Sequence, residues 1–257
     1  METLNLSRQP DGSLIHALLA DGFLQVWERP VANCRYLVSV RGGGAVRMVG
    51  GMREKERSVI MVLRHGYLVP ESEMWVRHRL AARLAPEVML DPTPLAEIVE
   101  MVARWYGRAL CLVEVKDGAI LARECQRLGA NVQVREVLDK ATGEFTKELG
   151  WLTDLNAGEA AYNALKNAIR ESNEHGDGKQ RRGALLMECA HCFAQLETFV
   201  PPGSDAPAIS RDEDVWTLAT GLYNLGSATK LREETRKRMG VPDRWKATED
   251  LRFRMAL

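Results

Sequence analysis

Acidic residues at two places in the sequence could hold a divalent metal ion. Glu114 lies within an apolar run, Leu110–Val115, and Asp212, Glu213 and Asp214 directly precede a second apolar segment. A carboxylate within an apolar strand needs a metal ion or a basic partner, because burying it alone is costly. Carboxylates that converge from separate elements form the Mg²⁺ or Mn²⁺ sites that hydrolyse phosphodiesters. We therefore take Glu114, Asp212 and Asp214 as candidate metal-binding and catalytic residues.

Each acidic position also has a purely structural interpretation. Glu114 could form an ion pair with Lys116 or Arg108, or face water at the end of its strand. The acids at 212–214 could cap a helix, because negative charge is favoured at a helix N-terminus. The residues themselves leave both interpretations open.

The spacing of two cysteines and the lack of a phosphate-binding motif argue against a zinc site and against ATP hydrolysis. Cys189 and Cys192 form a lone CxxC with His191 between them, whereas a structural zinc site needs four ligands. The sequence therefore favours a buried or helical segment with incidental thiols. No GxxxxGK[ST] phosphate-binding loop is present, so we expect no ATP hydrolysis.

Basic residues gather at a few places and predict phosphate contacts along a nucleic acid. The candidates for DNA binding are Arg77, Lys179, Arg181 and Arg182. The competing interpretation is a set of solvated faces. Lys+Arg and Asp+Glu both number 35, and this neutral sum argues against binding by bulk charge alone but allows a local basic face.

Composition limits the class of protein and its surroundings. The chain has 257 residues, enough for one large domain, and its five scattered cysteines favour a reducing compartment, which predicts a cytoplasmic protein. No stretch approaches the roughly 20 apolar residues that a membrane helix needs, so no membrane partner is expected.

The expected elements place the acidic residues at the edge of one sheet. Apolar runs at 35–40, 58–63 and 74–79 predict an antiparallel meander, with the charged stretch 53–57 as a solvated turn. A helix over 95–106, a strand over 110–115, a helix over 118–128 and a strand over 132–137 follow, and this alternation favours parallel pairing. A hairpin turn at 139–143, helices over 158–172 and 215–225, and a charged tail complete the chain. The prediction is an α/β fold with a ribonuclease H-like mixed central sheet flanked by helices.

Several short segments occur in the order found in one known family. They are 110–118 (LCLVEVKDG), 149–153 (LGWLT), 196–200 (LETFV) and 211–219 (RDEDVWTLA). Together they resemble the nuclease domain of the large terminase subunit of tailed phages. The resemblance divides the chain into a lead-in at 1–22, a nuclease-type domain at 23–228 and a charged tail at 229–257.

The resemblance implies a function and partners. It implies metal-dependent endonucleolytic cleavage of double-stranded DNA during phage DNA packaging, with Mg²⁺ or Mn²⁺ as cofactor. It also implies a separate ATPase motor, small terminase or portal protein as partner, in the cytoplasm of a phage-infected or prophage-carrying bacterium.

One position departs from the family pattern. The first strand of these nucleases ends in a metal-binding Asp, and here that position is Arg41. A guanidinium and a metal ion repel at short range, so Arg41 could instead pair with Glu114 or Asp212 and fill the site. The domain would then be a degenerate, non-catalytic module that binds DNA or a packaging protein. Alternatively, Glu54 or Glu56 supplies the missing carboxylate.

Overall fold

The fold is taken from a computed structural model of the chain. It describes the backbone of residues 1–20, 22–43, 46–49, 52–69, 74–86, 90–115, 120–138, 144–152, 155–173, 184–200 and 212–238, and side chains up to 225 within these ranges, except 46–49, 52–54, 68–69, 74, 138 and 155.

The centre of the molecule is a mixed sheet with the predicted topology. Its core strands are β4 (Tyr36–Arg41), β7 (Val59–Arg64), β10 (His78–Leu84), β11 (Leu110–Val113) and β12 (Asn131–Val132), in the order β12-β11-β4-β7-β10. Neighbours β4, β7 and β10 pair antiparallel, whereas β11 pairs parallel with both β4 and β12. The predicted meander followed by parallel strands is confirmed.

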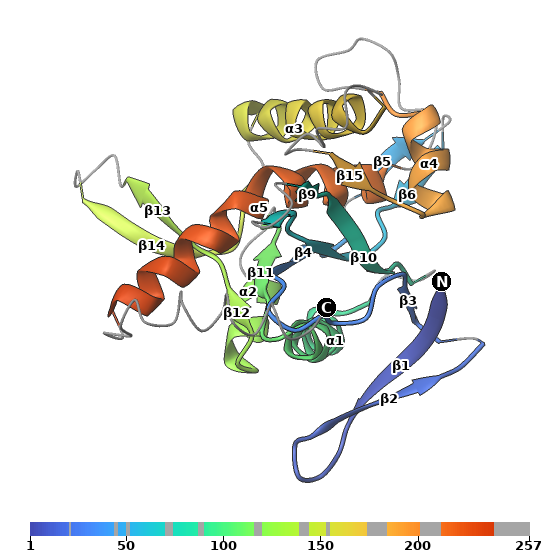
Figure 1. Ribbon diagram of the computed structural model, residues 1–257. Helices are drawn as coiled ribbons and strands as arrows, with labels where there is room; N and C mark the ends of the chain where they lie inside the picture. The colour runs from blue at the N-terminus through green and yellow to red at the C-terminus, as the bar shows by residue number, and fades with distance from the viewer. Residues whose placement is uncertain are drawn as a thin grey trace.

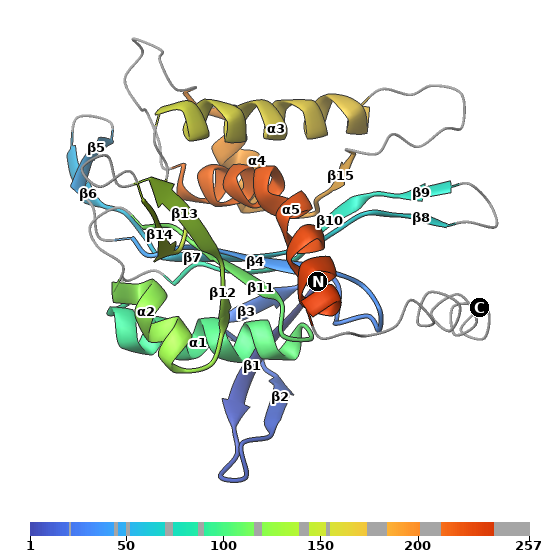
Figure 2. The ribbon, with the colours of Figure 1, turned by 90° about the vertical axis from the view of Figure 1, so that its left-hand side faces the viewer.

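Four more strands among the described residues enlarge this sheet. The order continues from β10 through β3 (Leu24–Val26) and β1 (Glu2–Arg8) to β2 (Leu14–Leu18), and β15 (Leu185–Leu186) also pairs with β10. The residues expected as a lead-in thus include two strands of the main sheet. The hairpin of β1 and β2 projects from the body of the molecule (Figures 1 and 2).

Helices cover both faces of the sheet (Figure 2). One face carries α1 (Pro92–Trp105) and α2 (Ile120–Arg127), and the other carries α3 (Leu155–Asn173), α4 (Ala190–Glu197) and α5 (Glu213–Arg238). Strand β7 is buried along its whole length and divides its side chains between two cores. Ile60 packs toward α1 and Met61 toward α5. Because both faces of the strand are buried, every position along it favours an apolar residue. No helix in the described ranges is long and apolar enough to cross a membrane.

Three two-stranded ribbons lie outside the main sheet. They pair β5 (Val46–Val49) with β6 (Met52–Lys55), β8 (Tyr67–Val69) with β9 (Met74–Val76), and β13 (Val134–Leu138) with β14 (Phe145–Leu149).

These ribbons correct three expectations. The strand expected at 74–79 is wrong, because 74–76 belong to a ribbon and the sheet strand is β10. The strand expected at 132–137 divides between β12 and the ribbon strand β13. The charged stretch 53–57 is no solvated turn, since 52–55 are paired as β6 and Glu56 is buried.

The four expected helices occur in the expected order, and the described residues also contain α4, but the lengths differ. Helices α1, α2 and α3 lie within a few residues of the expected ranges. Helix α5 begins at Glu213 and continues to Arg238, so it includes the start of the expected tail. The expected turn at 139–143 lies outside the described residues.

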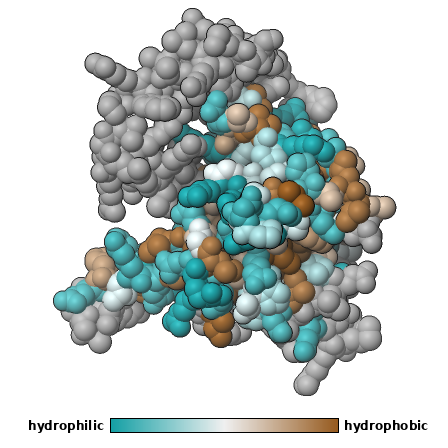
Figure 3. Space-filling model, turned by 90° about the horizontal axis from the view of Figure 1, so that it is seen from below, coloured by the Kyte–Doolittle hydropathy of each residue, from teal (hydrophilic) through white to brown (hydrophobic). Residues whose placement is uncertain are grey.

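Figure 3 shows how hydrophobic residues are distributed on one face of the molecule. On the face shown in Figure 3, the coloured residues include only small hydrophobic groups separated by hydrophilic ones.

Candidate functional site

Two neighbouring strand ends and one helix start meet at the same edge of the sheet. Arg41 is the last residue of β4, and Glu114 directly follows β11. The two positions lie side by side, because β4 and β11 are parallel and the Glu114 backbone N–H donates to the Val40 carbonyl at 2.8 Å. Ser39, two residues before Arg41, donates a hydrogen bond to the Thr217 carbonyl of α5 at 2.8 Å. Side chains alternate along a strand, so Arg41 also faces α5.

The Arg41 guanidinium occupies the centre of this edge. Its Nη1 lies 3.1 Å from Oε2 of Glu114, and its Nη2 lies 3.0 Å from Oε1 of Glu56. All three side chains are at most 9% exposed. Burial alone would lower the pKa of Arg41, but attraction from Glu114, Glu56 and Asp212 outweighs it and raises that pKa. The predicted pairing of Arg41 with Glu114 is therefore confirmed.

Glu56 lies at the site, as one of the sequence hypotheses required. Its carboxylate accepts a hydrogen bond from Arg41, so it neutralises the guanidinium. The side chain of Glu54 lies outside the described residues.

Asp214 is bound to a different arginine. Arg83 of β10 donates from Nε and Nη2 to the two carboxylate oxygens at 2.7 and 2.8 Å. The Gln195 side chain of α4 donates to the same carboxylate at 2.8 Å and accepts from the Asp214 backbone N–H at 3.0 Å. Asp214 is 1% exposed, so this bidentate pair is buried and fully hydrogen-bonded.

A β-bulge explains why Arg83 points toward α5. The register of β10 against β7 shifts between Leu80 and Ala82. Leu80 packs into the core on the α5 side, whereas Ala82 and Leu84 pack into the core on the α1 side. The bulge thus reverses the alternation and turns Arg83 toward Asp214.

The other two acids of this group contact other strand ends. Glu213 is 2% exposed and accepts a hydrogen bond from the Arg57 backbone N–H, next to β7, at 3.2 Å. The Asp212 carbonyl accepts from the Trp216 N–H at 2.9 Å and so begins α5, while its charge acts on Arg41. The three consecutive acids therefore approach the ends of β4, β7 and β10 in turn.

The carboxylates in this arrangement do not fit a metal centre. Glu114 and Asp214, two of the predicted ligands, each bind a different arginine. Within the described ranges, no three or more His, Cys, Asp or Glu side chains are placed to hold a metal ion. The role of Glu114, Asp212 and Asp214 as metal ligands stays a prediction.

The predicted DNA-binding residues fall into two groups. Arg77 is exposed, and its carbonyl accepts a hydrogen bond from Arg64 at 3.3 Å. Lys179, Arg181 and Arg182 lie outside the described residues.

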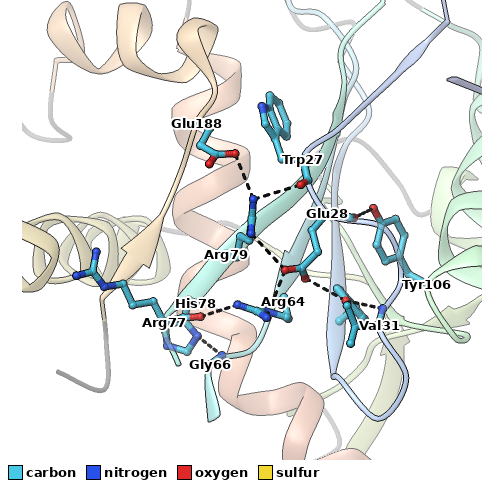
Figure 4. A network of polar contacts seen from close by, with 11 residues as sticks. Trp27, Glu28, Val31, Arg64, Gly66, Arg77, His78, Arg79, Tyr106 and Glu188 are labelled. Atoms are coloured by element: carbon cyan, nitrogen blue, oxygen red, sulfur yellow. Dashed lines mark hydrogen bonds and ion pairs between the residues drawn. The ribbon is translucent and has the colours of Figure 1, made fainter. Parts of the chain in front are cut away.

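Arg77 borders a second ion-pair network at the opposite end of β7 and β10 (Figure 4). Glu28 lies at its centre, with its Oε2 atom 3.3 Å from Arg64 and 3.6 Å from Arg79. Arg79 also contacts Glu188 at 3.2 Å.

The CxxC motif lies in a buried helical segment, as the sequence predicts. Cys189 and Cys192 are buried at the start of α4.

Sequence reasoning did not single out Gln195 or Glu28, and it placed Arg83 only in a basic group with Arg77 and Arg79, not beside Asp214. An arginine within the apolar run of β10 was a usable signal, because a buried cation requires an acidic partner. Gln195 and Glu28 carried no comparable local signal.

Comparison with known proteins identifies the fold. Neither a protein-family model nor a curated protein matches the sequence. Among solved structures, the large terminase nuclease of thermophilic phage G20c with bound cobalt is similar, with a TM-score of 0.50 and 13% identity over 86% of this chain and 92% of that chain. The Thermus phage P74-26 large terminase nuclease domain has a TM-score of 0.48 and 12% identity over 80% of this chain and 86% of that chain. The chain thus has the ribonuclease H-like fold of large terminase nucleases.

Proposed function

We propose that this chain is a terminase-type nuclease fold of a phage DNA-packaging system that binds double-stranded DNA without cutting it. The observation that carries the proposal is the buried Arg41 guanidinium, which bridges Glu114 and Glu56 at the edge where the carboxylates gather. The fold supports a place in DNA packaging, since the similar protein is a large terminase nuclease.

Electrostatics supports loss of cleavage. A divalent ion about 4 Å from the Arg41 charge would be repelled by about 8 kcal/mol at an effective dielectric constant of about 20. The ion would also have to compete for Glu114, which already holds Arg41. Arg41 thus supplies the positive charge that these carboxylates require.

Contact with DNA would come from basic residues other than Arg41. Arg77 is exposed, and we propose that it contacts phosphates together with Lys179, Arg181 and Arg182. Binding of this kind weakens steeply with salt, because each neutralised phosphate releases counterions.

A plasmid-nicking assay with Mn²⁺ or Mg²⁺, run beside a gel-shift titration at several salt concentrations, tests the proposal. The wild-type protein should shift duplex DNA and leave supercoiled plasmid intact. Arg41→Asp should produce metal-dependent nicking, since it replaces the resident cation with a carboxylate beside Glu114. Full nicking by the wild-type protein that Glu114→Gln abolishes would overturn the proposal.

The same assay separates the acids at the start of α5. The charge of Asp212 attracts Arg41, whereas Asp214 is bound to Arg83 and Gln195. In the Arg41→Asp background, Asp212→Asn should therefore abolish nicking, and Asp214→Asn should reduce it only as far as it unfolds the protein.

A second candidate function is metal-dependent endonucleolytic cleavage by Glu114, Asp212 and Asp214 with Mg²⁺ or Mn²⁺. The bound cobalt in the G20c nuclease favours it. Equal cleavage by the wild-type protein, Glu114→Ala and Asp214→Ala would reject this set of residues.

We propose the same cellular setting for either function. The partners would be an ATPase motor, a small terminase or a portal protein, in the cytoplasm of a phage-infected or prophage-carrying bacterium. Copurification of a tagged chain with these proteins from infected cells is the direct measurement.

A further inference from the structure

Cys189 and Cys192 lie in contact at the first turn of α4. Cys189 is the N-cap residue, with an extended backbone (φ −86°, ψ 106°), and its Sγ accepts a hydrogen bond from the Cys192 backbone N–H at 3.4 Å. Cys192 lies three residues after Cys189, so its side chain leaves the same face of this first turn. The capping geometry therefore holds both sulfur atoms on the same side of one helical turn.

The two thiols differ in character. The hydrogen bond from Cys192, together with the charge of Arg83, lowers the pKa of Cys189 to about 7 against the opposing effect of burial. The same contact and burial raise the pKa of Cys192. Burial instead raises the pKa of Cys125, which lies inside the α1-side core. The pair at α4 thus combines a nucleophilic sulfur with a protonated neighbour in contact with it.

We propose that Cys189 and Cys192 are an oxidation site, at which a peroxide converts the two thiols into a reversible intrachain disulfide. The Cys189 thiolate attacks one peroxide oxygen, the O–O bond breaks, and a sulfenic acid and hydroxide form. The Cys192 sulfur then attacks the sulfenic sulfur, and the sulfenic hydroxyl leaves with the Cys192 proton as water. The hydroxide takes up the proton that Cys189 lost on forming the thiolate and becomes the second water. Two thiols and one hydrogen peroxide give one disulfide and two waters.

Burial determines which oxidant fits. Cys189 and Cys192 are 1% and 0% exposed, so a bulky disulfide reagent cannot reach either sulfur without opening α4. Hydrogen peroxide is scarcely larger than water and needs a much smaller opening. Oxidation would fix the turn that precedes Gln195, which binds Asp214.

Peptide mass spectrometry after treatment with hydrogen peroxide tests the site. Trypsin releases residues 183–211 as one peptide with both cysteines and no others. After iodoacetamide labelling in denaturant, this peptide should lose both labels and two hydrogen atoms, and dithiothreitol should restore them. Cys34 is half-buried and is not paired with another thiol, so it is an internal control for reaction by exposure alone.

Two variants separate the roles of the sulfurs. Cys192→Ser should stop at a sulfenic acid on Cys189, which dimedone traps, and Cys189→Ser should leave Cys192 alkylatable. The proposal is overturned if wild-type residues 183–211 keep both labels while Cys34 is oxidised. The wild-type result decides even if a serine variant fails to fold.

Discussion

Replacing Arg41 with methionine should destabilise the protein far more than removing an exposed ion pair of similar length would. The variant keeps most of the side-chain volume but leaves Glu56 and Glu114 buried without their cation. Removing one partner of a buried ion pair costs about 3–5 kcal/mol, because the remaining charge is uncompensated. For a chain of this length, that corresponds to a fall in melting temperature of roughly 6–20 °C.

The control is a solvent-exposed ion pair of similar length on the same protein. Arg29 lies 2.9 Å from Glu2, but these side chains are 49% and 45% exposed. Such pairs contribute about 0–1 kcal/mol, so Arg29→Met should change stability little. Urea denaturation followed by circular dichroism measures both variants, and a matched loss in the two would refute the argument that burial decides the cost.

Charge and packing can be separated within the same series. Adding Glu56→Gln and Glu114→Gln to Arg41→Met removes all three charges and should recover most of the lost stability. If the triple variant is no more stable than the single one, lost packing rather than charge explains the effect.

Three further outcomes follow from the described geometry. Arg83→Met should cost about 3–5 kcal/mol in urea denaturation, because it leaves the buried Asp214 carboxylate without its cation. Gly43→Ala should cost about 2 kcal/mol or more in the same assay, because Gly43 has φ +72° and an added Cβ would lie 2.7 Å from backbone atoms. The control is Gly12→Ala, which should cost less, because Gly12 has a similar φ of +80° but an added Cβ there would meet no other atom. Burial lowers the pKa of His65 in the folded state, so the unfolded state binds more protons than the folded state does. The free energy of unfolding should therefore fall as the pH drops below about 6.5. His65→Gln should make that fall shallower.

The sequence predicted the central sheet because its strands are buried on both faces. The runs at β4, β7 and β11 are almost wholly apolar, and helices α1 and α2 precede and follow β11 in the alternation that parallel pairing requires. A strand of this kind is recognisable without knowing its neighbours. Local reasoning placed Glu114 at the end of its strand, whereas the resemblance to terminase nucleases singled out Arg41 at the end of the first strand.

The third strand was misplaced because its identity depends on a distant partner. The segment 74–79 has the alternation expected of a strand, and it does form one over 74–76, but in a ribbon. The sheet strand β10 contains Arg83, and local pattern argues against burying an arginine. Asp214, which makes that burial possible, lies 131 residues further along the chain.

The roles of the acids at 212–214 could not be separated from sequence for the same reason. Successive residues at the start of a helix project in different directions, about 100° apart, so three adjacent acids cannot share one ligand position. Here the strand ends settle the division: Asp212 acts on Arg41, Glu213 accepts from the Arg57 backbone, and Asp214 binds Arg83. Arg83 and Gln195 hold Asp214 whatever residue occupies position 41. A metal centre restored at this edge would therefore have to draw on Asp212, and Asp214 would serve to fix the start of α5 against β10.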